Sequence, residues 1–141
     1  MAFPVPPELV RAAERKLGRV FPPEYFVSIC ELNGGSVRDV RGEDWELFSI
    51  FDATDRRRLR ATCQDVCRET ERLRQLGWFP DGVVAIGTNG GGDAIVLLPS
   101  EDGRSFLPEI YCWRLDEPEL DVVADDFAGL IRTHKPPPSG H

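Results

Sequence analysis

The segment from Ile86 to Leu98 constrains the fold of this chain more than any other. One apolar run ends at Ile86, the sequence Gly-Thr-Asn-Gly-Gly-Gly-Asp follows, and a second apolar run begins at Ala94. Two apolar runs around a polar, glycine-dense loop are typical of two strands joined by a tight connection, whose backbone needs positive φ. The segment therefore predicts a pair of strands with residues 87–93 between them.

A second Asn-Gly-Gly, at residues 33–35, follows an apolar pattern with helical spacing and suits the left-handed conformation in which helices often end. Apolar residues recur at the same spacing in three further segments. We therefore expect helices from Pro6 to Gly18, from Pro22 to Asn33, from Arg56 to Leu76 and from Val122 to Thr133. In the last of these, the residues expected to face inward are Val123, Phe127, Leu130 and Ile131.

Shorter apolar runs indicate strands at residues 45–50, 83–86, 94–98 and 107–114. Helices come first, then strands that are neighbours in the sequence, then a helix, and this order predicts an α+β fold with a mainly antiparallel sheet. A chain of 141 residues suits a single domain, which we place at residues 1–134, followed by a disordered proline-rich tail at residues 135–141.

The charge of the chain is unevenly distributed. Residues 1–80 carry 13 basic and 13 acidic side chains, whereas residues 81–141 carry 4 basic and 11 acidic ones, which accounts for the whole net charge of −7. An acidic C-terminal part repels phosphates, so nucleic acid is not expected as a partner. It suits a basic protein partner if the acidic groups meet on one surface. The residues predicted to form this acidic face are Asp116, Glu117, Glu119, Asp121, Asp125 and Asp126.

Two further features bear on a partner surface. Trp113 alternates with core residues in a predicted strand, so it either points outward beside the acids as an interface anchor or packs partly buried. Arg56–Arg58 and Arg60 lie at the start of a predicted helix, where the helix dipole disfavours cations. They form either a solvated basic turn or a contact for an anion or a partner.

The chain lacks the motifs of an enzyme, so no catalytic residue is predicted. Its histidines are His134 and His141, and no serine or cysteine lies in a nucleophile motif. The glycine loop lacks the Gly-Lys-Ser/Thr of a phosphate-binding loop and precedes a strand, which favours a hairpin connection over a phosphate cradle. The cysteines include no Cys-x-x-Cys, so we expect neither a metal nor a cofactor, and four reduced, buried thiols at Cys30, Cys63, Cys67 and Cys112.

No apolar run approaches the roughly 20 residues that span a bilayer, and the first residues show no secretion signal. We therefore expect a cytoplasmic protein without a membrane partner. The chain has no extended heptad pattern, so a monomer is the default expectation.

Several short motifs follow one another in a recognisable order. They are Phe21-Pro22-Pro23-Glu24-Tyr25 leading to Leu32-Asn33-Gly34-Gly35, then Ile86–Asp93, then Tyr111 and Trp113 beside acids, and finally Ala124–Ile131. In this order and spacing the chain resembles the SUKH superfamily, whose founding members are fungal regulators of cell-wall assembly. The resemblance covers nearly the whole chain apart from the tail. It implies a single α+β domain with a twisted antiparallel sheet and helices on one side.

The resemblance also implies roles for the two glycine loops. In this superfamily such loops are mainly structural, so they are expected to define the fold rather than to bind or react. The residues to which this applies are Asn33, Gly34, Gly35, Gly87, Asn89, Gly90, Gly91 and Asp93.

The function that the resemblance implies is non-enzymatic protein binding. Bacterial members typically act as immunity proteins, which bind and neutralise a cognate toxin, often a nuclease, encoded beside them. Applied to this chain, the hypothesis is that the acidic face occludes a basic toxin domain. The alternative is a regulatory adaptor that binds endogenous proteins, as the fungal members do. A binder of small molecules or anions, using the backbone of Gly90–Gly92, ranks behind both.

Overall fold

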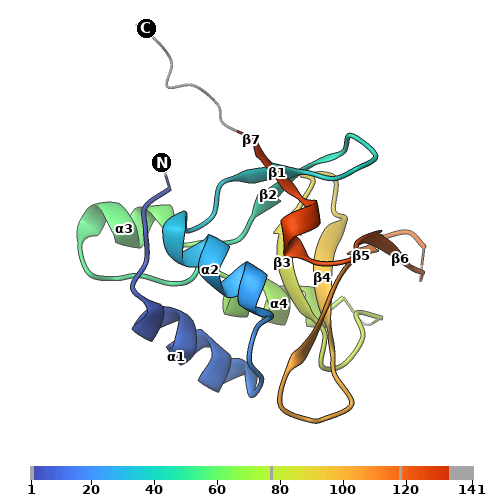
Figure 1. The fold of residues 1–141 in the computed structure, drawn as a ribbon, viewed down its shortest axis with the longest axis horizontal. Coiled ribbons are helices and arrows are strands. Elements are labelled where there is room, and N and C mark those ends of the chain that lie inside the picture. The colour runs from blue at the N-terminus through green and yellow to red at the C-terminus, as the bar shows by residue number, and fades with distance from the viewer. Residues whose placement is uncertain (1, 77, 118, 134–141) are drawn as a thin grey trace, which may run out of the picture.

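A computed structural model describes residues 2–76, 78–117 and 119–133. Over these ranges the chain forms four α-helices, one 3-10 helix and seven strands (Figure 1). The helices are α1 (Pro7–Leu17), α2 (Pro23–Glu31), α3 (Arg56–Ala61), α4 (Val66–Arg74) and the 3-10 helix η1 (Phe127–Gly129). The strands are β1 (Ser36–Arg38), β2 (Asp44–Leu47), β3 (Val84–Thr88), β4 (Ala94–Pro99), β5 (Phe106–Trp113), β6 (Leu120–Ala124) and β7 (Ile131–Thr133). The tail for which the sequence predicts disorder, residues 135–141, lies outside the described residues.

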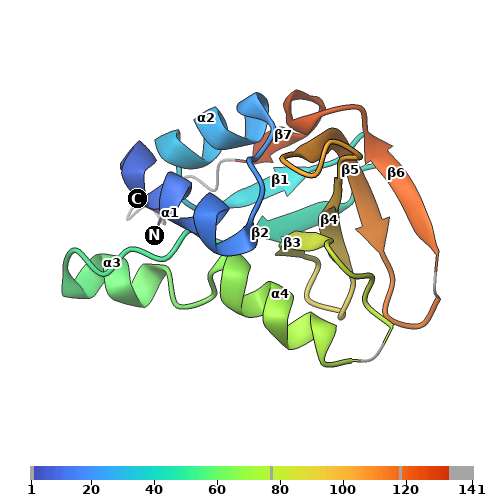
Figure 2. The ribbon, with the colours of Figure 1, turned by 90° about the horizontal axis from the view of Figure 1, so that it is seen from below.

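The strands form one antiparallel sheet in the order β6-β5-β4-β3-β2-β1-β7. The sheet curls, with the helices gathered toward one end of the molecule and β5 and β6 at the other (Figure 2). The core between helices and sheet holds the fully buried side chains of Tyr25, Trp45, Ile95 and Trp113. The fold is therefore α+β, with a twisted antiparallel sheet in a single domain, as the sequence predicts.

The hairpin predicted around the glycine loop is confirmed. Strands β3 and β4 pair from Val84 opposite Leu97 to Thr88 opposite Ala94. Within the loop, Gly90 and Gly92 have φ of 84° and 99°. These values lie in the region that side chains with a Cβ rarely adopt, which explains why the connection is so rich in glycine.

The first two predicted helices are also confirmed. Both α1 and α2 begin at a proline that needs no N–H partner, and each has an acidic residue, Glu8 or Glu24, near the positive end of its dipole. Gly18 ends α1 with φ of 80°, and its N–H donates to the carbonyl of Glu14. Both helices therefore form where local sequence signals place them.

The prediction of one long helix from Arg56 to Leu76 is wrong, because the chain breaks into α3 and α4 with residues 62–65 between them. Two aspartates act as N-caps: Asp55 accepts the N–H of Arg58, and Asp65 accepts the N–H of Arg68. A capping aspartate starts a new helix, and Asp65 lies inside the predicted one. Leu59, in α3, is exposed.

The prediction of a final helix from Val122 to Thr133 is also wrong. Val122 lies in β6 and pairs with Tyr111 of β5. Phe127–Gly129 forms η1, and Arg132 lies in β7 and pairs with Val37 of β1. Three of the four side chains expected to face inward are buried, namely Val123, Phe127 and Leu130, whereas Ile131 is 65% exposed. The apolar spacing identified core residues, but pairing with β5 and β1 set the backbone conformation.

The expectation of four buried thiols holds only for Cys112, and burial raises the pKa of its thiol to about 11. Cys30 and Cys67 are partly buried, and Cys63 is exposed. Cys63 falls in the break between α3 and α4, so it does not lie on a buried helix face. All four cysteines are free.

The hairpin of β1 and β2 is held by a buried carboxylate. Asp39 accepts the backbone N–H groups of Arg41 and Glu43 and the indole N–H of Trp45, at 2.9, 3.1 and 3.0 Å. Burial raises the pKa of Asp39, but these hydrogen bonds outweigh burial and leave the pKa below its ordinary value. The charged form of Asp39 therefore stabilises the folded state.

Asp39→Asn should make the free energy of unfolding depend less on pH in the acid range. Because the pKa is lower in the folded state, the contribution of Asp39 is complete above about pH 4 and is lost as the pH falls through the depressed value. Urea unfolding at neutral pH and under acid should show the parent losing more free energy of unfolding than Asp39→Asn. Equal losses in the two proteins would contradict this role.

Candidate partner-binding surface

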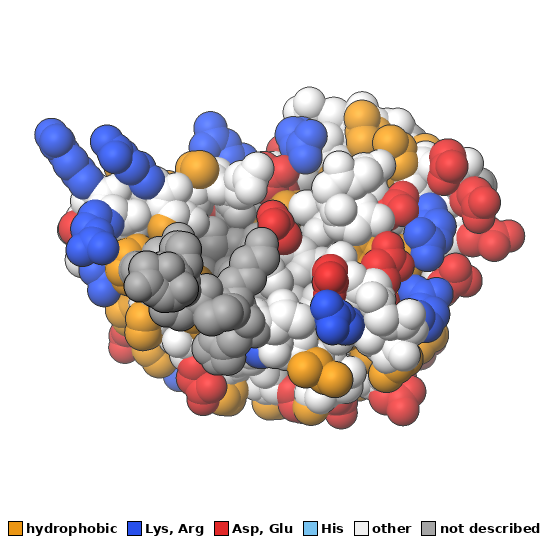
Figure 3. All heavy atoms as spheres, turned by 90° about the horizontal axis from the view of Figure 1, so that it is seen from above, with side chains coloured by type: hydrophobic (Ala, Val, Ile, Leu, Met, Phe, Trp, Pro, Cys, Tyr) orange, Lys and Arg blue, Asp and Glu red, His pale blue; other side chains and the backbone are white. Residues whose placement is uncertain are grey.

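Most of the predicted acidic residues meet at one end of the molecule. The acidic surface consists of five exposed residues on the β5–β6 connection, on β6 and directly after it: Asp116, Glu117, Glu119, Asp121 and Asp125. Figure 3 shows acidic side chains gathered at the end that carries β5 and β6, and a group of basic ones at the opposite end. The sixth predicted residue, Asp126, is partly buried and accepts the N–H of Gly129, so it caps η1.

Leu115 anchors the start of the acidic connection on the glycine loop. Its N–H donates to Asp93 Oδ1 at 3.0 Å, and its carbonyl accepts the indole N–H of Trp78 at 3.2 Å. Gly92 leaves room for the Leu115 side chain, since a Cβ at this glycine would lie 2.8 Å from Leu115 Cδ2. The glycine loop is therefore a platform on which the acidic connection is fixed.

A charged network completes this platform. The guanidinium of Arg114 bonds to Asp93 at 3.0 Å and lies 3.8 Å from Glu43. Asn89 Nδ2 donates to both carboxylates, at 3.1 Å to Glu43 and 3.2 Å to Asp93. The network ties the glycine loop to the β1–β2 hairpin and to the end of β5. One cation shared between two carboxylates leaves the region acidic.

Trp113, one of the residues predicted for the partner surface, is fully buried, so of its two alternatives the exposed anchor is wrong and packing in the interior is what the structure shows. Its ring packs 4.4 Å from the ring of Trp78 and meets Phe79 edge-on at 5.2 Å. Aromatic packing of this kind outweighs the alternation of the strand, because it removes a large apolar area from water. Trp113 supports the acidic surface from beneath rather than contacting a partner.

Sequence reasoning missed the residues that hold the acidic surface in place, namely Arg114, Leu115, Trp78 and Glu43. One signal was available: Arg114 is the one basic residue between Arg104 and Arg132. An isolated cation within an acidic stretch is a candidate for an ion pair. Its partners, however, come from segments distant in the sequence.

The glycine loop has the geometry of a closed connection rather than of an anion site. The N–H of Gly90 donates to Thr88 Oγ1 at 3.2 Å, and that of Gly91 to Asn89 Oδ1 at 2.9 Å. These donors are used within the loop, and the carboxylate of Asp93 lies at its end. The loop therefore offers no support for binding a phosphate through the backbone of Gly90–Gly92.

The other Asn-Gly-Gly also makes internal contacts. Asn33 Nδ2 donates to the carbonyl of Ile50 at 2.8 Å, and Asn33 Oδ1 accepts the N–H of Ile50 at 2.7 Å. Gly34 and Gly35 follow with φ of 104° and 83°, which turns the chain from α2 into β1. Gly87 lies in β3 against the backbone of β2, where a Cβ would come within 2.7 Å of the carbonyl oxygen of Glu46.

The arginine cluster at Arg56–Arg60 lies in α3, at the end of the molecule opposite β6 (Figure 2). Arg58 pairs with Asp55 at 2.6 Å, and Arg57 and Arg58 both lie over the ring of Phe3. Arg56 and Arg60 are exposed. The cluster therefore has a partly structural role, and its positive charge lies at the opposite end of the molecule from the acidic surface.

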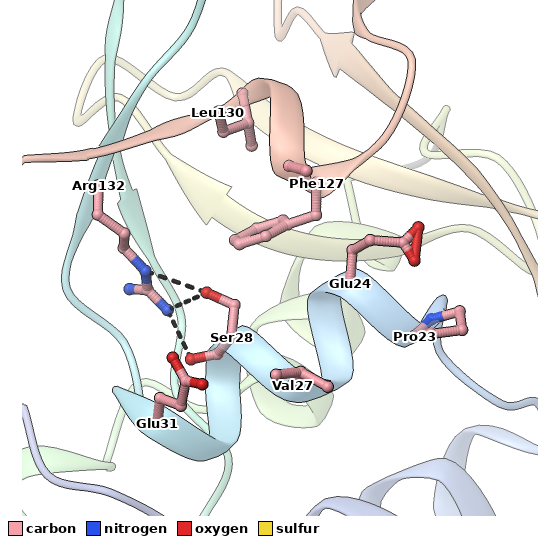
Figure 4. A pocket seen from close by; sticks show the side chains of 9 residues that line it. Pro23, Glu24, Val27, Ser28, Glu31, Phe127, Leu130 and Arg132 are labelled. Atoms are coloured by element: carbon pink, nitrogen blue, oxygen red, sulfur yellow. Dashed lines mark hydrogen bonds between the residues drawn. The ribbon is translucent and has the colours of Figure 1, made fainter.

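A hollow of about 490 Å³ lies between α2 and η1, and Val27, Phe127 and Leu130 line it. Figure 4 shows these side chains. Arg132 reaches into this region, but its guanidinium donates to Ser28 and to the carbonyls of Leu32 and Gly34. These bonds reach the carbonyls of Ser28 in the last turn of α2 and of Leu32 and Gly34 directly after it, where a helix end leaves acceptors available. Arg132 therefore fixes α2 in place and has few donors left for a ligand.

Within residues 2–76, 78–117 and 119–133, no group of three His, Cys, Asp or Glu side chains is placed to hold a metal ion. Over the same part of the chain, no helix has the length and apolar character needed to cross a membrane.

A comparison with protein families matches residues 4–133 to the SMI1 / KNR4 family (SUKH-1). The chain belongs to the SUKH-1 family. Searches of curated proteins and of solved structures gave no match. The match over residues 4–133 confirms the recognition made from the sequence motifs. SUKH domains are protein-interaction domains and are generally non-enzymatic.

Proposed function

We propose that this SUKH domain is a cytoplasmic immunity protein that binds and neutralises a basic toxin domain encoded nearby. The observation that supports this proposal most is the acidic surface of Asp116, Glu117, Glu119, Asp121 and Asp125. Its exposed carboxylates face solvent, while Leu115 and Arg114 hold the connection that carries them. The surface is thus both charged and pre-organised.

Such a surface suits an immunity protein for kinetic reasons. A toxin must be captured before it acts, and opposite charges speed diffusional encounter well above the rate of neutral partners. Toxins that cleave nucleic acid need a basic cleft for their substrate. An acidic surface fixed on a rigid platform would occupy such a cleft in place of the phosphates. No ordering of the loop would then be needed on binding, which preserves affinity.

The alternative is a regulatory adaptor that binds endogenous proteins. The observation in its favour is the separation of charge, since the exposed arginines of α3 lie far from the acidic surface (Figure 2). Two surfaces of opposite sign suit two different partners. The genes next to that of this chain discriminate the proposals, because a large modular exported protein supports immunity and a metabolic or signalling operon supports the adaptor.

The first test is capture of the partner by the tagged chain at low salt, followed by mass spectrometry. One stoichiometric partner with a basic toxin-like domain is the expected result, and co-expression should then rescue growth of cells that make the toxin. Several weak housekeeping partners would instead support the adaptor.

Removing the charge of the acidic surface should slow association with this partner. The variant is Asp116→Asn, Glu117→Gln, Glu119→Gln and Asp121→Asn combined. We expect the association rate at low salt to fall by about 10- to 100-fold and its salt dependence to flatten, since electrostatic steering supplies that increment. Stopped-flow fluorescence at several salt concentrations measures both quantities.

A matched control removes the same charge elsewhere, with Glu8, Glu24, Glu31 and Glu101 changed to Gln, all of them exposed. This control should keep most of the rate and of the salt dependence. If the acidic-surface variant associates as fast and as salt-sensitively as the parent, the partner binds elsewhere.

A further inference from the structure

A long groove runs between α1 and α4, and no residue of the acidic surface lines it. It consists of two adjoining hollows of about 440 and 740 Å³, and both are lined by Lys16, Phe51, Asp65 and Cys67. The first hollow extends along α1 to Leu9, and the second along α4 to Gln75. In Figure 2, α1 lies in the half of the molecule away from β6, and α4 runs along the lower edge toward the middle of the molecule.

The floor of this groove is apolar. Phe51 is 49% exposed although it follows the buried Ile50, and Leu9, Leu17 and Cys67 lie beside it only partly covered. Burial raises the pKa of the Cys67 thiol, so this side chain is uncharged at neutral pH. A half-exposed aromatic ring within a hollow is the kind of side chain that anchors a protein interface.

The rim of the groove is cationic, in contrast to the net charge of −7 for the whole chain. Five cations line it, Arg15, Lys16, Arg68, Arg72 and Arg74, against the three carboxylates of Asp65, Glu69 and Glu71. Arg72 pairs with Glu69 and Arg74 with Glu71.

The remaining charges of the rim are not balanced. Asp65 is buried and caps α4. Among the residues that the structure describes, Arg15, Lys16 and Arg68 have no carboxylate within 4.0 Å, and all three side chains are exposed. An occupant of the groove therefore meets an excess of positive charge.

The hollow between α2 and η1 differs in this respect (Figure 4). Its rim carries Glu24 and Glu31, and its cation, Arg132, already donates to the end of α2. Its lining is largely apolar, and the cation that lines it already donates hydrogen bonds within the protein. The groove between α1 and α4 is thus distinguished by its unbalanced positive charge as well as by its apolar floor.

We infer that the α1–α4 groove binds an acidic amphipathic segment of a second protein partner. Apolar side chains of such a segment would cover Phe51, Leu9 and Leu17, and its carboxylates would reach the unpaired cations of the rim. Nucleic acid suits the groove less well, since the carboxylates of Glu69 and Glu71 line the same hollow as its cations and the floor is apolar. The inference does not depend on the proposed immunity function, because it concerns a different surface and a partner of opposite charge.

The test uses a synthetic peptide of about four helical turns, with leucine on one face at i, i+3, i+4 and i+7 and glutamate elsewhere. Titration into the isotope-labelled chain, followed by NMR, should shift the amide signals of Leu9, Phe51 and Cys67. Lys16→Glu with Arg68→Glu should weaken binding by about tenfold or more at low salt. Phe51→Ala should weaken it by a similar factor, because it removes the apolar anchor.

Two controls make the result specific. Arg56→Glu with Arg60→Glu applies the same charge change to α3, outside the groove lining, and should alter the Kd by no more than about twofold. The variant with a neutralised acidic surface should bind the peptide as the parent does, which separates this inference from the immunity proposal. A peptide with lysine in place of glutamate should not bind.

Three outcomes would overturn the inference. They are no binding of the acidic peptide, equal binding of the lysine peptide, and tighter binding of a short duplex DNA whose signals map to the same groove.

Discussion

Gly87→Ala should destabilise the protein by about 3 kcal/mol, since an overpacked site against fixed backbone has little room to relax. A Cβ at Gly87 would lie 2.7 Å from the carbonyl oxygen of Glu46 and 3.2 Å from Ile95 Cγ1. The oxygen belongs to the neighbouring strand β2, whose Leu47 pairs with Gly87. To accept the methyl group, β2 and β3 must move apart, which weakens the centre of the sheet. Urea unfolding followed by circular dichroism gives the free energy of unfolding.

Gly91→Ala is the matched control for this substitution. Gly91 has no positive φ, and the nearest atom to its Cβ would be Asn89 Oδ1 at 3.5 Å, an ordinary contact. It should change stability by no more than about 0.5 kcal/mol, because the strain is absent and the unfolded chain loses some freedom. Equal effects at positions 87 and 91 would show that close packing of Gly87 against β2 is not what requires glycine.

Asn33→Ala is the second substitution with a large expected effect, a loss of about 3 kcal/mol. The side chain satisfies both the N–H and the carbonyl of Ile50, at 2.7 and 2.8 Å, and both residues are buried. Alanine leaves two backbone groups unpaired where water does not reach them easily, and each such group costs about 1–3 kcal/mol. The free energy of unfolding in urea and the thermal midpoint should both fall.

Asn89→Ala provides the comparison in the other Asn-Gly-Gly. Asn89 bonds to Glu43, Asp93 and the N–H of Gly91, but it lies in a partly exposed loop where water can replace the lost partners. We expect a loss of about 1 kcal/mol. If Asn33→Ala costs no more than Asn89→Ala, the two bonds to Ile50 do not carry the stability assigned to them.

The two loops with the same Asn-Gly-Gly sequence thus act differently. Asn33 bridges the end of α2 to the segment after β2, across 17 positions of the chain. Asn89 arranges its own loop and joins it to Glu43, which steadies the platform beneath the acidic surface. Substitutions at Asn33 should therefore act on global stability, and those at Asn89 on the position of the acidic connection.

The features that local sequence signals predicted correctly are those governed by residues close together in the chain. The proline and acid starts of α1 and α2, the glycine that ends α1 and the hairpin at residues 84–99 all depend on φ preferences and end effects within a few residues. The order of such motifs was also sufficient to recognise the SUKH family, because a family match depends on the order and spacing of residues along the chain. The acidic character of the C-terminal part follows directly from the sequence.

The features that the sequence did not predict depend on contacts between distant segments. The stretch from Val122 to Thr133 has apolar residues at helical spacing, yet its two ends pair with β5 and with β1. This pairing gives hydrogen-bond partners to backbone N–H and C=O groups of β5 and β1 that would otherwise lie at the edges of the sheet. Trp113 is buried because Trp78 and Phe79, more than 30 positions earlier, stack on it. The platform of Asp93, Arg114 and Glu43 and the groove between α1 and α4 likewise arise only when separate elements pack together. Local preference is worth a fraction of a kcal/mol per residue, and tertiary burial and pairing exceed it at these positions.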